Sequence, residues 1–297
     1  MKDQKSVIIE SALDISEKTE SNCIFLFLNT TRICRWFLKS GMYKDDNVII
    51  VIPHTLGIRD IELKKAGVTA IRSWSGNQTR FSQIKYAFFH GVMQGLIKPD
   101  SRVVCVLGPW GKGHLDTVTV HDLALSWSEE FPFDPRLLIS KRALNAVMAV
   151  VDIALDIGAL GREGKSIGTT FIIGDTEEVL KSSHQAVFNP FKGYPKKERI
   201  ITRSEVVESI KEFAQLDGAI IISDTGVIEA AGRHLDAAGA VTRQLRGLGS
   251  RHRAAAGMTR KTEAVAVVVS ESTGRVTIFD NGRIISSLEP VISRRIV

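Results

Sequence analysis

The chain has 297 residues, of which 44% are apolar and 24% are charged, and its formal net charge at pH 7 is +6. These values are typical of a soluble globular protein with room for two domains. The moderate positive charge suits an anionic partner, but by itself it does not distinguish a nucleotide from a nucleic acid.

Cysteine usage and hydropathy exclude several classes. The chain has three widely spaced cysteines, Cys23, Cys34 and Cys105. Their odd number and the lack of a C-x-x-C spacing predict reduced thiols in a cytosolic protein rather than a metal site. The N-terminus has no apolar signal core. The longest apolar stretch, residues 143–160, is broken by Asp152 and Asp156, so we interpret it as a buried helix. We therefore predict a cytoplasmic protein with no membrane segment.

The first half of the chain alternates short apolar runs with segments of helical spacing. Strands are predicted at residues 23–28, 48–53, 68–72 and 101–108, helices at about 31–38 and 80–95, and a helix or turn at about 58–66. Such alternation predicts a mostly parallel sheet with right-handed crossovers. Prolines at 132 and 135 interrupt the pattern. We place a boundary there, which gives domains of residues 1–134 and 135–297.

The second half predicts a mixed sheet surrounded by helices. Helices are expected at about 136–158, 176–182, 203–215 and 234–245, and strands at 167–174, 219–222, 227–230, 264–269 and 275–279. The last two strands form a hairpin. The predicted fold class is thus α/β, a mostly parallel sheet followed by a mixed-sheet α/β domain.

Two glycine-rich segments and two histidines are further candidates for phosphate, anion or metal sites. Residues 161–166 imitate the end of a P-loop, but Ala159 stands where its first glycine belongs and the segment leaves a helix for a strand. We interpret it as a turn that ends the long helix. Residues 108–114 follow a strand, and an anion site and a surface loop both remain open there. His114 and His121 match no metal-ligand spacing, so we interpret them as surface residues.

Two polar motifs about thirty residues apart carry the chemistry. The first is Asp217 and Gly218, just before the apolar strand that starts at Ala219. The second contains Gly249, Ser250, Arg251, His252 and Arg253. Guanidinium groups bind phosphate oxygens, glycines let backbone N–H groups converge on an anion, and carboxylates bind Mg²⁺ or Mn²⁺. This combination favours a polyphosphate substrate over a solvated basic turn. No aromatic residue interleaves with the arginines, so a nucleic-acid partner is not expected.

Residues from about 140 to 290 resemble the diadenylate cyclase (DAC) domain. The resemblance is carried by Gly161-Arg162-Glu163-Gly164-Lys165, Ile167-Gly168-Thr169, Ile173-Gly174-Asp175, Asn189-Pro190-Phe191, Leu216-Asp217-Gly218-Ala219, Gly232-Arg233-His234-Leu235, Gly249-Ser250-Arg251-His252-Arg253 and Val269-Ser270-Glu271. The first half more weakly resembles the α/β domain at the C-terminal end of pyruvate kinases. This arrangement is similar to that of archaeal diadenylate cyclases.

The resemblance implies that two ATP molecules condense to cyclic di-AMP and two pyrophosphates. It implies that Asp217 and Glu271 hold a divalent metal, Mn²⁺ or Mg²⁺, and that Asp217 assists the attacking hydroxyl. The catalytic residues are expected to be Asp217, Arg251, His252 and Arg253. The expected ATP-binding residues are Asp217, Gly218, Ala219, Gly232, Leu235, Gly249, Ser250, Arg251, His252 and Arg253. The family commonly has threonine at the position of Ser250 and often an acid at that of Ser272.

The reaction also predicts assembly. One domain offers one set of these groups, whereas two ATP molecules have to react with each other. Two identical sites facing each other across a two-fold axis would supply both nucleophiles, so we expect a homo-oligomer that is at least a dimer. The alternative is a non-catalytic receptor for cyclic di-AMP or ATP, against which the acids Asp217 and Glu271 argue.

Overall fold

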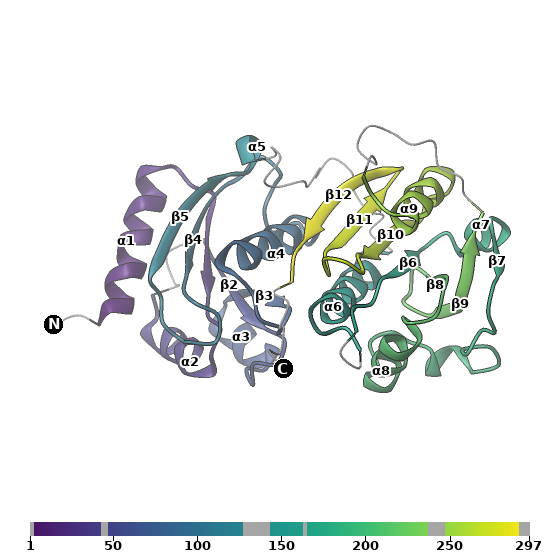
Figure 1. Ribbon diagram of the computed structural model, residues 1–297. Helices are drawn as coiled ribbons and strands as arrows, with labels where there is room; N and C mark the ends of the chain where they lie inside the picture. Colours follow the sequence, from purple (N-terminus) through teal and green to yellow (C-terminus); the bar gives the residue numbers. More distant parts are fainter. Residues whose placement is uncertain (1–2, 43–46, 127–142, 163–164, 237–246, 291–297) are drawn as a thin grey trace. The chain divides into compact units, whose positions relative to one another are not determined.

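The computed structural model describes residues 3–42, 47–126, 143–162, 165–236 and 247–290 (Figure 1). The chain divides into two compact units, Met1–Phe131 and Pro132–Val297, and each is described by itself. The boundary predicted at residues 131–135 lies outside the described residues.

The first unit is built on a five-stranded sheet with the order β3-β2-β1-β4-β5. Its strands are β1 (Cys23–Phe27), β2 (Val48–Pro53), β3 (Thr69–Ser73), β4 (Arg102–Leu107) and β5 (Thr117–Asp122). Strands β1 to β4 are parallel, and β5 is antiparallel to β4. The mostly parallel sheet is therefore confirmed. Strand β5 was not predicted, because it is only partly buried and lacks a continuous apolar run.

Helices cover both faces of this sheet. They are α1 (Gln4–Lys18), α2 (Thr31–Ser40), α3 (Asp60–Ala66), α4 (Arg80–Met93) and α5 (Leu123–Ser126). Ile24 and Leu26 of β1 pack in one cluster with Phe37 of α2. The intervening Phe25 points the other way, and its ring centroid lies 5.8 Å from that of Phe88 in α4. Burial on both faces explains why these strands are continuous apolar runs in the sequence.

The second unit is built on a seven-stranded mixed sheet with the order β12-β11-β10-β6-β8-β9-β7. Its strands are β6 (Thr169–Ile173), β7 (Ser183–Gln185), β8 (Ala219–Ile222), β9 (Ile228–Leu235), β10 (Val265–Val269), β11 (Val276–Asp280) and β12 (Arg283–Leu288). Only the β6–β8 pair is parallel among the strand pairs of this sheet in the described residues. The predicted mixed sheet and the C-terminal hairpin are confirmed.

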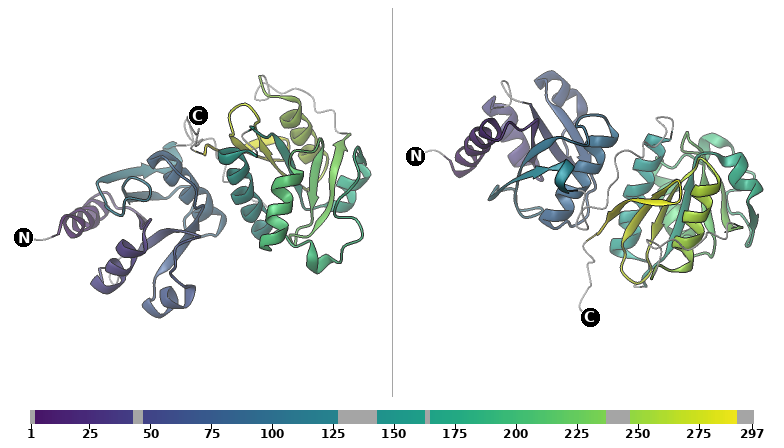
Figure 2. Two further views of the ribbon diagram at one scale, coloured as in Figure 1. Left: turned by 60° about the horizontal axis from the view of Figure 1, so that its bottom comes forward. Right: turned by 90° about the horizontal axis from the view of Figure 1, so that it is seen from above.

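Two long helices lie on this sheet, α6 on one face and α9 on the other (Figure 2). The helices of the unit are α6 (Leu144–Leu160), α7 (Thr176–Lys181), α8 (Ser204–Phe213) and α9 (Ser250–Lys261), with a short 3₁₀ turn, η1 (Lys196–Glu198). Ala255 and Met258 of α9 pack on Ile172 and Ile221 of the sheet. Within the described ranges of both units, every helix is too short or too polar to cross a bilayer.

The structure corrects the predicted elements at three places. The helix predicted over 234–245 is wrong at its start, because β9 continues through Leu235; residues 237–246 lie outside the described residues. Strands β7 and β12 were not predicted. Arg251, His252 and Arg253 were not expected to form a helix, yet they begin α9, whose alanines pack on the sheet.

Candidate active site

The predicted site residues lie at one end of the central strands of the seven-stranded sheet, and we call this end the sheet edge. The register pairs Thr170 of β6 with Ala219 of β8, and Thr169 with Val269 of β10. The starts of β6 and β8 and the end of β10 therefore meet. Glu271 follows β10, so this edge brings together motifs that are far apart in the sequence.

Asp217 and Gly218 enter this edge directly before β8. The exposed Asp217 carboxylate accepts a hydrogen bond from the backbone N–H of Gly218, at 3.0 Å. Gly218 has a φ of 104° and lies against Gly232 of β9, whose carbonyl carbon would be 2.6 Å from a Cβ at position 218. Glycine is thus required at 218 both by the backbone conformation and by the close approach of β9.

Helix α9 begins at the same edge. Its N-cap is Gly249, which has no side chain to accept a hydrogen bond, and its first turn contains no acidic residue. The first backbone N–H groups of a helix have no partner within the helix, and they carry the positive end of its dipole. The start of this twelve-residue helix is therefore suited to an anion such as phosphate.

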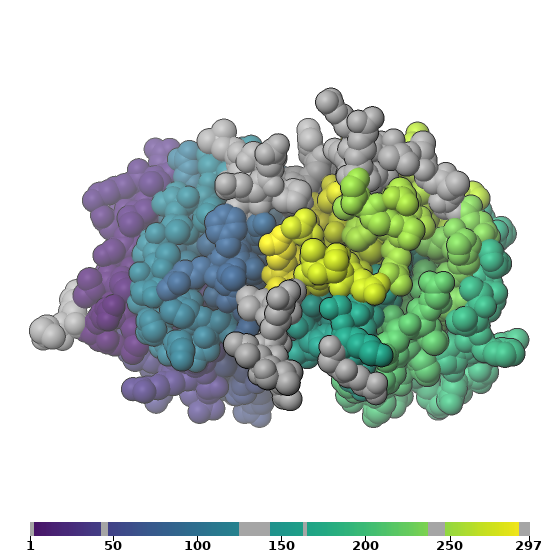
Figure 3. Space-filling model, in the orientation of Figure 1, coloured from purple at the N-terminus to yellow at the C-terminus, as the bar shows by residue number. Residues whose placement is uncertain are grey.

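A cavity of about 510 Å³ adjoins the first turn of α9. Its lining residues are Ser166, Gly249, Ser250, Arg251, His252, Val269, Ser270, Glu271 and Ser272. The volume falls in the range of small-molecule sites. Figure 3 shows α9, in yellow-green, at the surface of the second unit.

Arg251 and Glu271 meet across this cavity. Nη1 of Arg251 donates to Oε2 of Glu271 at 3.0 Å, and both side chains remain accessible to solvent, at 39% and 61%. The family resemblance implied that Arg251 binds phosphate and that Glu271 binds metal. It did not predict that the two side chains pair.

His252 lines the cavity with a side chain that is otherwise buried. Its ring packs edge-on against Phe279, with 6.0 Å between centroids. Burial, followed by the positive charges of Arg251 and Arg275, lowers the pKa of His252 below its ordinary value of 6.5. Near neutral pH the ring of His252 is therefore uncharged.

The other predicted site residues do not line the cavity. Nη1 of Arg253 donates to the carbonyl of Leu248 at 2.6 Å, which fixes the turn that enters α9. Ala219 and Leu235 pack in the core cluster beneath α9. Gly232 approaches the segment that follows β7, where a Cβ would lie 2.3 Å from Cγ2 of Val187. Among the ATP-binding predictions in the described residues, the lining positions are thus those from Gly249 to His252.

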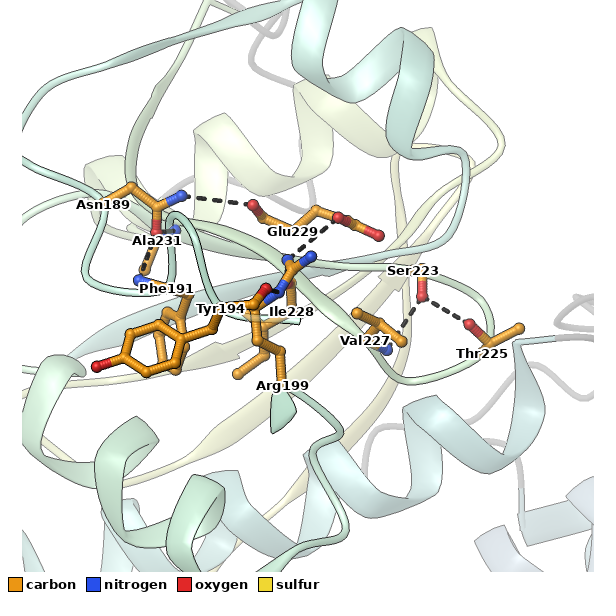
Figure 4. A network of polar contacts seen from close by, with 10 residues as sticks. All are labelled: Asn189, Phe191, Tyr194, Arg199, Ser223, Thr225, Val227, Ile228, Glu229 and Ala231. Carbon is orange, nitrogen blue, oxygen red and sulfur yellow. Dashed lines mark hydrogen bonds and ion pairs between the residues drawn. The ribbon is translucent and has the colours of Figure 1, made fainter. Parts of the chain in front are cut away.

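Asn189 and Phe191, of the motif Asn189-Pro190-Phe191, lie beside β9 (Figure 4), and no residue of the motif lines the cavity. Oδ1 of Asn189 accepts from the backbone N–H of Ala231 at 3.2 Å, and its Nδ2 donates to the carbonyl of Glu229 at 3.4 Å. Arg199 donates to the carbonyl of Ile228 and pairs with the Glu229 carboxylate. Side chains therefore supply hydrogen-bond partners to backbone groups along this edge of β9, a structural role that sequence reasoning missed.

The two acids predicted to bind metal fit an ion that arrives with a nucleotide. Across the described residues, no three histidine, cysteine, aspartate or glutamate side chains gather into a metal-binding group. Mg²⁺ is usually held by one or two carboxylates together with phosphate oxygens and water. Asp217 and Glu271 are exposed carboxylates at one sheet edge, which matches this donor set rather than a preformed protein cage.

The chain is similar to known proteins over most of its length. The family model described as DAC, the DisA bacterial checkpoint controller nucleotide-binding domain, matches residues 156–284. A diadenylate cyclase of Methanocaldococcus jannaschii is 29% identical over 95% of this chain and 96% of its own length. One of Haloferax volcanii is 31% identical over 70% of this chain and 75% of its own. One of Mycoplasma pneumoniae is 37% identical over 22% of this chain and 31% of its own. Because it is 31% identical to the Haloferax volcanii enzyme over most of both chains, the protein belongs to the diadenylate cyclase family of nucleotidyltransferases.

Proposed function

We propose that this protein condenses two ATP molecules to cyclic di-AMP and two pyrophosphates. In each half-reaction the 3′-oxygen of one ATP forms a bond to the α-phosphorus of the other. The bond from that phosphorus to the bridging oxygen breaks, pyrophosphate leaves, and the hydroxyl proton passes to a base. Phosphoryl transfer of this kind depends mainly on positioning and on neutralising charge.

The observation that supports this proposal most directly is the cavity at the start of α9. Backbone N–H groups of the first helical turn and the Arg251 guanidinium are the donors that a triphosphate requires. They would stabilise the negative charge that develops on the leaving pyrophosphate. The neutral ring of His252 would contribute a hydrogen bond to the same phosphates.

Asp217 is proposed to accept the proton of the attacking hydroxyl and, with Glu271, to provide carboxylate oxygens for Mn²⁺ or Mg²⁺. A bound divalent ion would lower the pKa of the hydroxyl and neutralise part of the phosphate charge. Exposure of both carboxylates leaves them accessible to a nucleotide that enters the cavity edge.

The proposed active form is at least a dimer of facing cyclase domains, each spanning residues 135–297. Each subunit would bind one ATP, and each bound ATP would supply the nucleophile for the other. Residues 1–134 are proposed to form the separate domain that resembles the C-terminal domain of pyruvate kinases, and the four parallel strands of the first unit support this assignment.

The test is to incubate the protein with ATP and either Mn²⁺ or Mg²⁺ and to identify the product by mass spectrometry. Cyclic di-AMP should form, and Asp217→Asn should abolish it without changing the melting temperature. Asp224→Asn is the matched control, because this acid lies in the turn at the opposite end of β8 and should leave turnover unchanged. Tight binding of cyclic di-AMP with no consumption of ATP would instead support a receptor.

The dimer has a separate test. When wild-type protein is mixed with an excess of Asp217→Asn protein and allowed to exchange subunits, most wild-type subunits acquire an inactive partner. Their yield of cyclic di-AMP should fall, and the singly linked intermediate should accumulate. Cyclic di-AMP production that stays proportional to the wild-type protein present would contradict the facing-dimer arrangement.

A further inference from the structure

Gly168, the residue directly before β6, lies beneath the ion pair at the cavity. A Cβ at this position would be 2.8 Å from Nη1 of Arg251 and 2.8 Å from Cβ of Glu271. It would also be 3.1 Å from the backbone nitrogen of Glu271. Carbon atoms do not approach other heavy atoms this closely without a shift of one of them, so any side chain at 168 would displace its neighbours.

Gly168 is not required here by its backbone conformation. Its φ lies outside the left-handed region that favours glycine, in contrast to Gly218, whose φ is 104°. An alanine at 168 could therefore adopt the same backbone angles. What it could not do is leave room for the Arg251 guanidinium, which makes the constraint one of space rather than of chain flexibility.

The Arg251 guanidinium depends on few other contacts. In the described residues its one side-chain hydrogen bond is the 3.0 Å contact to Glu271, and 39% of the side chain is exposed. A long side chain held at a single point has many alternative rotamers in solvent. The absence of a side chain at Gly168 is thus what allows the guanidinium to lie at the sheet edge beside the cavity.

We propose that Gly168 is a positioning residue for Arg251. This inference rests on the proposed function, because Arg251 is taken to bind the triphosphate. With alanine at 168, the guanidinium would move away from the sheet edge, and substrate would lose a correctly placed donor although Arg251 itself is still present.

The test is a double-mutant cycle with Gly168→Ala and Arg251→Ala. It is measured on kcat/KM for cyclic di-AMP formation and on the Kd of a non-hydrolysable ATP analogue. Gly168→Ala alone should weaken both, by up to about a hundredfold in kcat/KM, because misplacing a reacting or binding group by about 1 Å can cost that much. In the Arg251→Ala background the same change should have a clearly smaller effect, because its contact with Nη1 of Arg251 is gone and only the two contacts with Glu271 remain.

The control is Gly57→Ala in the first unit, because a Cβ there would meet no atom within 4 Å. It should leave both constants unchanged. Equal losses from Gly168→Ala with and without Arg251 would overturn the proposal, and so would a Gly168→Ala protein with wild-type constants. If Gly168→Ala does not fold, Arg251→Ala in the same chain should restore folding, and failure to restore it counts against the proposal.

The cycle also separates this inference from the proposed function. If the wild-type protein forms no cyclic di-AMP, the proposed function fails, but the cycle on the Kd of the ATP analogue still decides the role of Gly168. If cyclic di-AMP is formed and the two substitutions act additively, the function stands and the positioning role is wrong.

Discussion

Two arginine–glutamate pairs in the second unit have different surroundings. Arg199 pairs with Glu229 at 3.3 Å on the outer edge of β9, where the two side chains are 12% and 23% exposed. Arg251 pairs with Glu271 at 3.0 Å at the cavity, where the corresponding values are 39% and 61%. Arg199 also donates to two backbone carbonyls, those of Tyr194 and Ile228. Arg251 has no such carbonyl acceptor for its side chain among the described residues.

The difference indicates what each cation does. A buried guanidinium that satisfies a strand edge and a carboxylate contributes to folding, and its removal leaves buried acceptors without donors. An exposed guanidinium with unused donors contributes little to folding and is available to a ligand. Fractional exposure together with the number of backbone acceptors therefore separates a structural arginine from a candidate binding residue.

The largest effect is expected from Arg251→Met. Removing a donor aimed at charge that develops in the reaction typically lowers turnover about 10²- to 10³-fold, or roughly 2.7–4 kcal/mol. We expect a loss of this size in kcat/KM with ATP, while the melting temperature changes by less than about 2 °C because the pair is exposed. Arg260→Met, an exposed position in the last turn of the same helix, is the control. A large loss of stability with normal turnover would reverse our assignment.

Arg199→Met should have the next largest effect, and on stability. The change leaves the Glu229 carboxylate and two carbonyls without their donor. Since Glu229 retains some contact with water, we expect a loss of about 2–3 kcal/mol of unfolding free energy rather than the full value for a buried pair. Thermal and urea unfolding measure this loss.

The control for Arg199 is Arg203→Met, because Arg203 is exposed and donates to a single carbonyl, that of Lys197. Its substitution should change the unfolding free energy by less than about 0.5 kcal/mol. For Arg199→Met, kcat/KM per folded molecule should remain near the wild-type value. A selective loss of ATP affinity in this variant would show that the β9 edge also serves the substrate.

Substitutions of Glu229 and Glu271 should also differ in their effect on stability, with smaller losses than those of the arginines. Glu229→Gln removes a partly buried charge opposite Arg199 and should cost about 1–2 kcal/mol of unfolding free energy. Glu271→Gln breaks an exposed pair and should cost less than about 1 kcal/mol, while it raises the metal concentration needed for half-maximal turnover. Equal stability losses in chemical denaturation would remove the distinction between the two pairs.

The sequence predicted strand β8 with its observed bounds because all four residues are buried, which produces an unbroken apolar run. Helix α9 was missed because Met258 is the one large apolar side chain on its buried face, and because Arg251 to Arg253 resemble a solvated turn. The polar motifs were found one by one, but the Arg251–Glu271 pair depends on the packing of α9 against β10, which no local pattern encodes. The role of Arg199 likewise depends on the carbonyl of Ile228, which lies 29 residues further along the chain.

The smallest effect concerns the charge of Arg251 acting on His252. Burial is the first cause that lowers the pKa of His252, and the charge of Arg251 is the second. Because the folded pKa lies below 6.5, the unfolded chain binds more protons in the window from about 6.5 down to the folded pKa. Stability is therefore fully present above about pH 6.5 and declines as the pH falls through this window, by at most about 1.4 kcal/mol per pH unit.

Substitutions of Arg251 and Arg199 test whether the charge of Arg251 lowers the pKa of His252. Arg251→Met should raise the pKa of His252 measured by NMR titration, although burial keeps it below the ordinary value, and should make the acid-induced loss of stability less steep. Arg199→Met should leave this pKa unchanged, since Arg199 is not among the charges that act on the ring. His252→Gln should remove this part of the pH dependence altogether. An unchanged His252 pKa in Arg251→Met would mean that solvent screens the exposed guanidinium, so that burial and the charge of Arg275 keep the ring neutral beside the cavity.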